Sequence, residues 1–178
     1  MADRTEEILG RYLDGDFIVF PLAETAVSRK QIAAIAAKLG VIFPEEIADH
    51  VCGAFPGIYV EVKEAVWPRP KEFDVGPFWS FLYAVHTYTS APESEPWMRL
   101  DHEGERFQRA TGLVAAPVLR VVGDADLYCV DASGALCRFR HEERRLEPVE
   151  GDYWSIFERE VRELRERKDR KRAEAARS

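Results

Sequence analysis

The fold class of this chain is decided at residues 58–64, which read Ile-Tyr-Val-Glu-Val-Lys-Glu. Apolar and polar side chains alternate there, which is typical of a β-strand with one face turned to a core and the other to water. Upstream, Ser28 and Gln31 have the spacing of a capping box, and the apolar residues that follow recur at helical spacing until Gly40. Because one chain contains both periods, the sequence predicts a single-domain α+β protein.

The rest of the chain adds elements of both kinds. Residues 78–88 are apolar on both faces and predict a central strand that is buried on both sides. A short helix is predicted at residues 101–110, and a final amphipathic helix begins at Asp152. Further strands are predicted at residues 118–122, 127–130 and 136–139, the last two joined as a hairpin.

The predicted domain boundary follows the loss of apolar positions near the C-terminus. Residues 1–168 are predicted to form one domain, with residues 1–24 as an N-terminal extension packed on it. After Leu164 the apolar stripe of the last helix stops, and charged pairs four residues apart replace it. Residues 169–178 are therefore predicted to be a charged tail that frays into solvent.

The charge of the chain is unevenly distributed. The net charge is −7, but residues 159–178 carry nine Lys/Arg and five Asp/Glu, a net of +4, which leaves −11 for residues 1–158. An acidic body repels nucleic-acid phosphates and attracts basic proteins, although plain solubility explains such a balance as well. The basic end could touch nucleic acid, but its interleaved acids favour a solvated helix end. We therefore expect no nucleic-acid partner.

Targeting signals are not visible in the sequence. No apolar run approaches the ~18 residues of a membrane helix, and the first residues are too acidic for a signal peptide. The cysteines Cys52, Cys129 and Cys137 stand at unrelated spacings in apolar surroundings, a pattern typical of buried thiols in a reducing compartment. These observations predict a cytoplasmic protein with no membrane partner.

No catalytic motif stands out either. Phosphate-binding glycine loops, a serine nucleophile motif and paired zinc-ligand motifs are all missing from the sequence. We therefore predict a protein that is not an enzyme and has no cofactor and no metal. One alternative stays open: Asp124 and Asp126, with His141, could hold a divalent ion in a metal-dependent hydrolase or a ligand-binding enzyme. Gly-Asp is also ordinary turn chemistry, which we prefer here.

The most unusual stretch combines tryptophans with prolines at residues 67–79 and again at residues 96–97. Tryptophan in a rigid, partly exposed loop suits protein recognition, although such rings also close the ends of a core. Our candidate partner-binding residues are two tryptophans and the acidic residues nearest the first of them: Glu61, Glu64, Trp67, Asp74 and Trp97.

Several segments in combination resemble the SUKH superfamily, the Smi/Knr-type proteins, and a bacterial subset in particular. They cover roughly residues 25–170: Leu-Gly-Val-Ile-Phe-Pro at 39–44, Phe-Pro-Gly-Ile-Tyr-Val at 55–60, Trp67-Pro68, Gly-Pro-Phe-Trp-Ser-Phe-Leu-Tyr at 76–83, Gly-Asp-Ala-Asp-Leu-Tyr-Cys at 123–129, and a closing strand and helix from Leu136 to about Lys168. Many members carry Asn-Gly-Gly where this chain has Cys52-Gly53-Ala54. The resemblance implies a mixed, mainly antiparallel sheet flanked by helices, with a long C-terminal helix.

The resemblance also implies a function in protein binding. Bacterial members are mostly thought to be immunity proteins, which bind and neutralise toxins, often nucleases. The family has no catalytic residues to carry over, and its binding surface varies, so no residue here inherits a role. We expect a protein partner, a toxin domain with a basic surface. A regulatory scaffold or adaptor, as proposed for eukaryotic relatives, is a further alternative.

Overall fold

The structure is a computed structural model that describes residues 2–178. Over these residues it contains five α-helices, seven strands and two short 3-10 helices. The helices are α1 (Arg4–Tyr12), α2 (Arg29–Leu39), α3 (Glu45–Val51), α4 (Leu100–Thr111) and α5 (Tyr153–Arg177), with η1 (Phe78–Phe81) and η2 (Pro96–Met98). The strands are β1 (Phe17–Pro21), β2 (Ile58–Val62), β3 (Ala84–Thr87), β4 (Ala115–Val121), β5 (Leu127–Asp131), β6 (Leu136–Arg140) and β7 (Arg145–Pro148).

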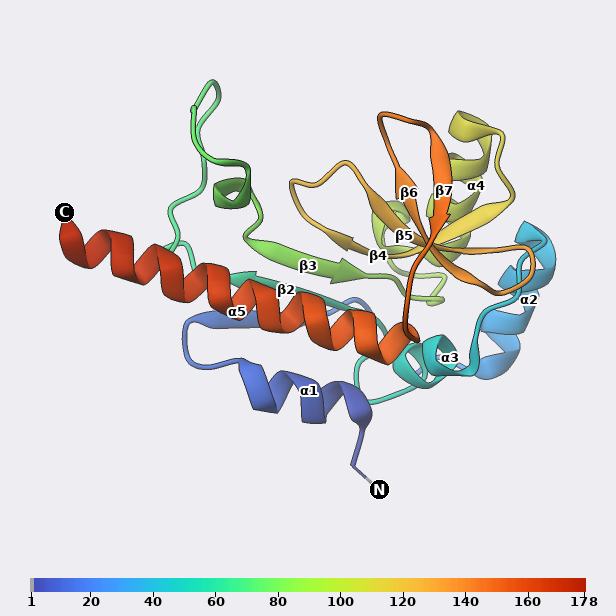
Figure 1. Cartoon of the computed structure of the whole chain (residues 1–178). Coiled ribbons are helices and arrows are strands. Elements are labelled where there is room, and N and C mark those ends of the chain that lie inside the picture. The colour runs from blue at the N-terminus through green and yellow to red at the C-terminus, as the bar shows by residue number, and fades with distance from the viewer. Residues whose placement is uncertain (1) are drawn as a thin grey trace.

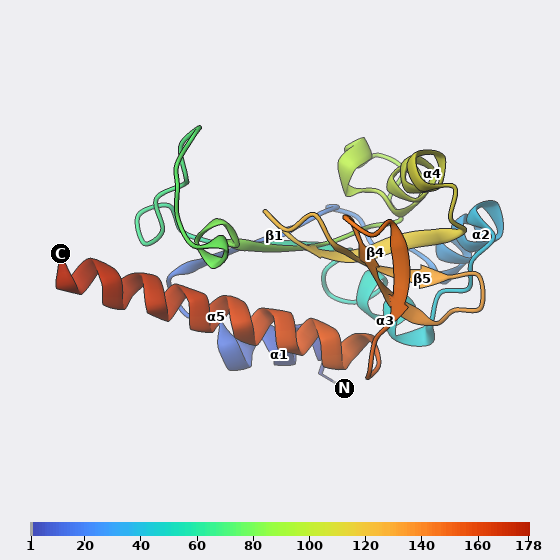
Figure 2. The ribbon, with the colours of Figure 1, turned by 45° about the horizontal axis from the view of Figure 1, so that its top comes forward.

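The strands form one sheet in which the spatial order follows the chain order from β1 to β7. Every neighbouring pair is antiparallel, so the sheet is a meander of consecutive strands. Helices α1 and α5 cover one face of this sheet, and α4 lies on the other (Figure 1); the turned view gives the same layers (Figure 2). The predicted α+β fold, with a mainly antiparallel sheet, flanking helices and a long C-terminal helix, is confirmed.

Local chemistry sets where the helices begin and end. The Ser28 hydroxyl accepts from the Gln31 backbone N–H at 3.3 Å, and the Gln31 side chain accepts from the Ser28 N–H at 2.6 Å, so the predicted capping box is confirmed. Helix α2 ends at Gly40, whose φ of +69° suits a residue without a Cβ atom. Asp152 caps α5 by accepting from the backbone N–H of Ser155 at 2.8 Å.

Two hydrophobic cores hold the layers together. The alternating residues of β2, Ile58, Val60 and Val62, are fully buried in the main core, which also contains Phe157 and Val161 of α5. A smaller cluster lies under α4 and joins it to the sheet; its buried members are Phe107, Ala115, Cys129, Cys137 and Phe139. Over β4–β6 the sheet is therefore covered on both faces, by α4 on one and by the main core with α5 on the other.

Residues 78–88 do not form the single strand that their composition predicts. Pro77 leads into the 3-10 turn η1, in which the Ser80 N–H donates to the Pro77 carbonyl at 2.9 Å, and Phe78 is 61% exposed. Only β3 is a strand here, and all four of its residues are buried. The prediction of burial on both sides thus applies to β3 alone, because apolar composition does not distinguish a buried strand from an exposed turn.

The C-terminal segment also differs from its prediction. Helix α5 continues to Arg177, and the Lys168 side chain is only 2% exposed. Its Nζ atom lies 2.8 Å from an Asp14 carboxylate oxygen and 3.3 Å from one of Asp16, and Arg172 also pairs with Asp16. The acids that hold the basic helix end come from the segment between α1 and β1, which is far away in sequence.

The N-terminal residues are part of the sheet itself. Strand β1 forms its edge and pairs with β2 from Phe17, opposite Val62, to Pro21, opposite Ile58. Helix α1 packs beside α5 (Figure 1), and its Tyr12 hydroxyl donates to Glu158 at 2.8 Å. Within residues 2–178, no helix combines the length and the apolar character needed to cross a bilayer.

Candidate protein-binding site

The segment between β2 and η1 projects from the body of the protein. Residues 68–78 rise from the sheet on the same side as α4 in both views (Figures 1 and 2). We call this segment the 68–78 loop. Three of its apolar side chains are open to solvent: Phe73 is 90% exposed, Val75 is 101% exposed and Phe78 is 61% exposed. Single exposed apolar residues are common, but three on one projecting loop suit a protein contact.

Trp67 closes the base of this loop. Its side chain is fully buried, and its indole Nε1–H donates to the backbone carbonyl of Ser80 at 3.1 Å. The ring also meets the rings of Trp79 and Tyr83 edge-on, with centroids 6.0 and 6.4 Å away. One tryptophan thereby ties the residue before the loop to the turn after it.

Arg69 stiffens the first arm of the loop. Its guanidinium lies over the Tyr83 ring at 4.1 Å and donates to the carbonyl oxygens of Val62 at 2.6 Å and of Trp67 at 2.9 Å. The same group pairs with Glu61 at 3.4 Å. These contacts hold the backbone in place before a partner arrives, which lowers the entropy that binding has to overcome.

The end of α5 supports the same region from the other side of the sheet. The Arg170 guanidinium lies 4.5 Å from the Trp79 ring, and the Lys171 ammonium lies 5.6 Å from the rings of both Trp67 and Trp79. Cations over indole faces are attracted by the ring quadrupole. The basic helix end therefore contacts the protein's own tryptophans as well as its own carboxylates.

The tip of the loop is a turn with a strained residue. The Asp74 carboxylate accepts from the Lys71 N–H at 2.6 Å, and the Asp74 N–H donates to the Lys71 carbonyl at 3.0 Å. Phe73, between them, has a φ of +68°, which is unfavourable for a residue with a Cβ atom. Three loop residues are prolines with restricted φ, Pro68, Pro70 and Pro77. Strain at an exposed aromatic residue is the kind of feature that accompanies function.

A row of aromatic rings runs across β1, β2 and β3 to η2. Phe20, Tyr59 and His86 are cross-strand neighbours on β1, β2 and β3, and Trp97 of η2 lies against His86. Successive ring centroids are 6.0, 6.1 and 5.3 Å apart. The end members Phe20 and Trp97 are 44% and 47% exposed. We call these four residues the aromatic row; its two ends are open to solvent, whereas His86 is buried.

The structure places the five candidate residues from the sequence at different depths. Glu64 and Asp74 are exposed, and Asp74 lies at the loop tip. Trp97 is a half-exposed end of the aromatic row. Glu61 is partly buried and paired with Arg69. Trp67 as an interface residue is a wrong prediction, because its side chain is wholly buried under the loop.

Asp124, Asp126 and His141 lie close together but are engaged in structural contacts. The Asp124 carboxylate pairs with Arg138 at 2.9 Å and accepts from the Asp126 N–H at 2.9 Å, as an ordinary turn does. Asp126 pairs with Arg138 and Arg140 and accepts from the His141 backbone N–H. In residues 2–178 no group of three or more His, Cys, Asp or Glu side chains is arranged to hold a metal ion. The geometry therefore favours ion pairs over a metal site.

The exposed side chains of the loop were not among the residues that the sequence singled out. Phe73, Val75 and Phe78 stand among prolines, glycine and charged residues, where no apolar period predicts burial. That lack of period is the one signal that could have identified them. Phe20 belongs to a short apolar run, and only its position on an edge strand exposes it.

Comparisons with known proteins add no assignment. A scan against protein-family models matches none of them, and searches of the curated proteins and of the solved structures also find no match. The resemblance to the SUKH superfamily therefore stays a prediction from the sequence.

Proposed function

We propose that this chain is a non-catalytic protein-binding module whose partner docks on the 68–78 loop and on the exposed ends of the aromatic row. The observation that carries the proposal is the display of Phe73, Val75 and Phe78 on a loop whose base is fixed by Trp67 and Arg69. Binding energy in protein interfaces is concentrated in a few apolar and aromatic side chains that fill pockets on the partner. A preorganised loop presents such side chains with little loss of conformational entropy.

The partner that we propose is a toxin domain with a basic surface, which would make this chain an immunity-type protein of the SUKH superfamily. The charge distribution supports a basic partner, since residues 1–158 carry a net charge of −11. The basic end of α5 offsets part of this charge, since Lys168 and Arg172 are paired with Asp14 and Asp16, and the chain as a whole keeps a net charge of −7. An acidic protein of this kind captures basic partners through long-range attraction, and apolar contacts then hold the complex.

A double substitution in the loop tests the binding surface. Phe73→Ser with Val75→Ser is expected to weaken partner binding by at least ~30-fold, because even one central apolar contact contributes about 2 kcal/mol or more. The wild-type chain is used to capture partners from extracts of its own cell and of neighbouring strains. The affinity of the purified partner for each variant is then measured by calorimetry.

The matched control replaces exposed apolar residues elsewhere. Ile42 and Val114 are 58% and 52% exposed and lie outside the loop and the aromatic row. The variant with Ile42→Ser and Val114→Ser should bind like the wild type. Equal binding by the loop variant would show that the surface is wrong, and the absence of any retained protein even at low salt would contradict the function itself.

The salt dependence of association separates an immunity-type complex from a neutral scaffold. For a basic toxin domain, the association rate is expected to fall by ~10-fold or more between low and physiological ionic strength, since electrostatic steering is screened by salt. The dissociation rate should change much less, because the apolar contacts that set it are not screened. Stopped-flow measurements over a salt series give both rates. An association rate that does not respond to salt would favour the scaffold or adaptor alternative.

A further inference from the structure

A cavity of about 300 Å³ lies between α4 and strands β4–β6, apart from the 68–78 loop. Its apolar wall is formed by Phe107 of α4, Phe139 of β6, Pro117 of β4 and Leu127 of β5. The rings of Phe107 and Phe139 meet edge-to-face, with centroids 5.0 Å apart.

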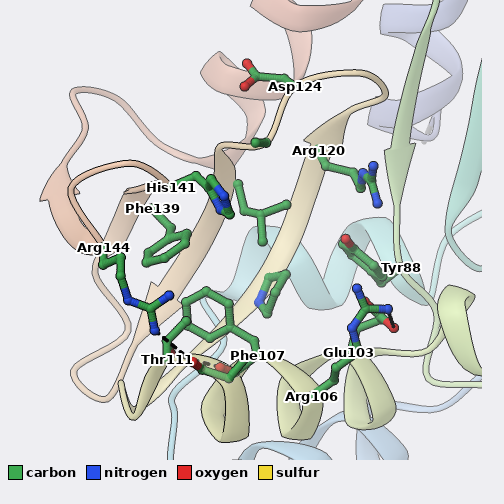
Figure 3. Close-up of a pocket in the computed structure, with 14 residues that line it drawn as sticks. Tyr88, Glu103, Arg106, Phe107, Thr111, Arg120, Asp124, Phe139, His141 and Arg144 are labelled. Carbon is green, nitrogen blue, oxygen red and sulfur yellow. Dashed lines mark hydrogen bonds and ion pairs between the residues drawn. The ribbon is translucent and has the colours of Figure 1, made fainter.

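Figure 3 shows polar groups around these rings, with Arg120, Tyr88 and Arg106 on one side and His141 and Arg144 on the other.

Arg120 is the most unusual residue in this cavity. No hydrogen bond or ion pair joins its guanidinium to any other residue in the described part of the chain, and its Nε atom is buried without a partner. An arginine carries five N–H donors, and a buried donor that stays unpaired destabilises the folded state. Tyr88 lies beside it, and its side chain is only 2% exposed. Both residues line the cavity, and the guanidinium of Arg120 has no partner among the described residues.

His86 is the cross-strand neighbour of Arg120. Burial, and to a smaller extent the nearby Arg120 charge, lower the pKa of His86 to about 3, so the imidazole is neutral. Both of its ring nitrogens are buried without a partner. The positive charge of Arg120 is therefore left without a counter-charge on the β3 side.

The other charged groups leave the cavity with an excess of positive charge. Arg106 pairs with Glu103 at 3.4 Å, and Arg144 donates to the Ala110 carbonyl at 2.8 Å. Asp124 also lines the cavity, but its carboxylate is paired with Arg138. Three arginines therefore line this cavity, and Arg120 has no ion-pair partner among the described residues. Such a cluster is unexpected in a chain with a net charge of −7. Guanidinium groups in this arrangement match carboxylate and phosphate oxygens.

We propose that this cavity binds a small organic anion, whose carboxylate or phosphate contacts Arg120 and Tyr88 and whose flat apolar body packs against Phe107 and Phe139. The volume is at the lower end of the range for small-molecule sites, which fits a single-ring compound. An apolar wall with a few convergent polar groups is the usual composition of such sites. The proposal does not depend on the protein-binding function.

Titration with simple probes tests the site. Benzoate and phenyl phosphate are added to the full-length chain, with benzamide as a neutral probe of the same shape and inorganic phosphate as an anion without an apolar body. We expect the two aromatic anions to shift the NMR signals of Tyr88 and Phe107 and to raise the melting temperature. Benzamide and inorganic phosphate should each bind at least ~10-fold more weakly, because benzamide lacks the negative charge and inorganic phosphate lacks the apolar ring.

Substitutions connect binding to the named residues. Arg120→Gln should weaken the aromatic anions by more than 10-fold, and Tyr88→Phe should weaken them less. Arg109→Gln is the matched control, since Arg109 is exposed on α4 and does not line the cavity. Circular dichroism verifies that each variant is folded. Wild-type protein that binds neither aromatic anion, or a folded Arg120→Gln variant that binds them unchanged, would overturn the proposal. If inorganic phosphate bound as tightly as phenyl phosphate, the proposed packing of the ligand's ring against Phe107 and Phe139 would be wrong.

Discussion

Replacing Trp67 with alanine is expected to lower the free energy of unfolding by about 3–5 kcal/mol. The side chain is fully buried at the base of the 68–78 loop, so truncation leaves a cavity between β2 and η1. It also removes the indole donor from the Ser80 carbonyl and the ring beneath the Lys171 ammonium. Urea denaturation followed by circular dichroism measures the difference.

Two further variants separate packing from exposure. Trp67→Phe keeps most of the apolar surface but loses the hydrogen bond, and a smaller loss of about 1–3 kcal/mol is expected. Trp97→Ala removes a residue of the same type that is 47% exposed, and it should cost less than about 1 kcal/mol. A Trp67→Ala variant as stable as the Trp97→Ala variant would show that the loop base does not hold the fold.

Acid should destabilise the protein well above the pH at which carboxylates titrate. His50 and His86 are 1% and 3% exposed, and burial lowers their pKa values to about 4 and about 3. His50 is held neutral between two hydroxyl groups, those of Thr5 and Thr87, each 2.8 Å from a ring nitrogen. Both histidines are thus uncharged in the folded state at neutral pH.

The sign of the effect follows from the protons bound by each state. In the unfolded chain a histidine titrates near pH 6.5, so between pH 6.5 and about 4 the unfolded state binds more protons than the folded one. Stability therefore falls as the pH is lowered through this window, by about 2–3 kcal/mol for each histidine at pH 4.5. Asp16, whose pKa is lowered to about 2 chiefly by its hydrogen bond from Arg172, acts only below this window. Burial raises the pKa of Glu160, and this group opposes part of the loss.

Unfolding free energies at pH 7.0, 5.5 and 4.5 measure this dependence. The variant His86→Phe shows how much of it is due to His86. Since neither ring nitrogen of His86 has a partner, phenylalanine leaves no group unpaired. Between pH 6.5 and 4.5 the unfolding free energy of the variant should fall by only about half as much as that of the wild type. His141→Phe is the control for replacing a histidine by phenylalanine, because His141 is exposed. An unaltered slope in His86→Phe would contradict the assignment.

Much of the secondary structure could be predicted from the sequence. The alternation at residues 58–64 forms β2, the capping box at Ser28 begins α2, and the hairpin of β5 and β6 lies where the sequence predicts it. Helix α4, predicted for residues 101–110, spans Leu100–Thr111. The candidate site was predicted only in outline: the tryptophan- and proline-rich stretch does form the projecting loop, but its exposed side chains are Phe73, Val75 and Phe78.

The sequence by itself determined the α+β class and most helices and strands, because caps and side-chain periods act between residues that are neighbours along the chain. Only the tertiary structure decided which side chains are buried or paired. Lys168 is buried because Asp14, 154 residues away, accepts from it, and Trp67 is buried because η1 and the end of α5 close over it. Arg120 is left without a counter-charge because β3 places a neutral histidine beside it. Such contacts join segments that no local pattern connects, so their outcome depends on the folded chain.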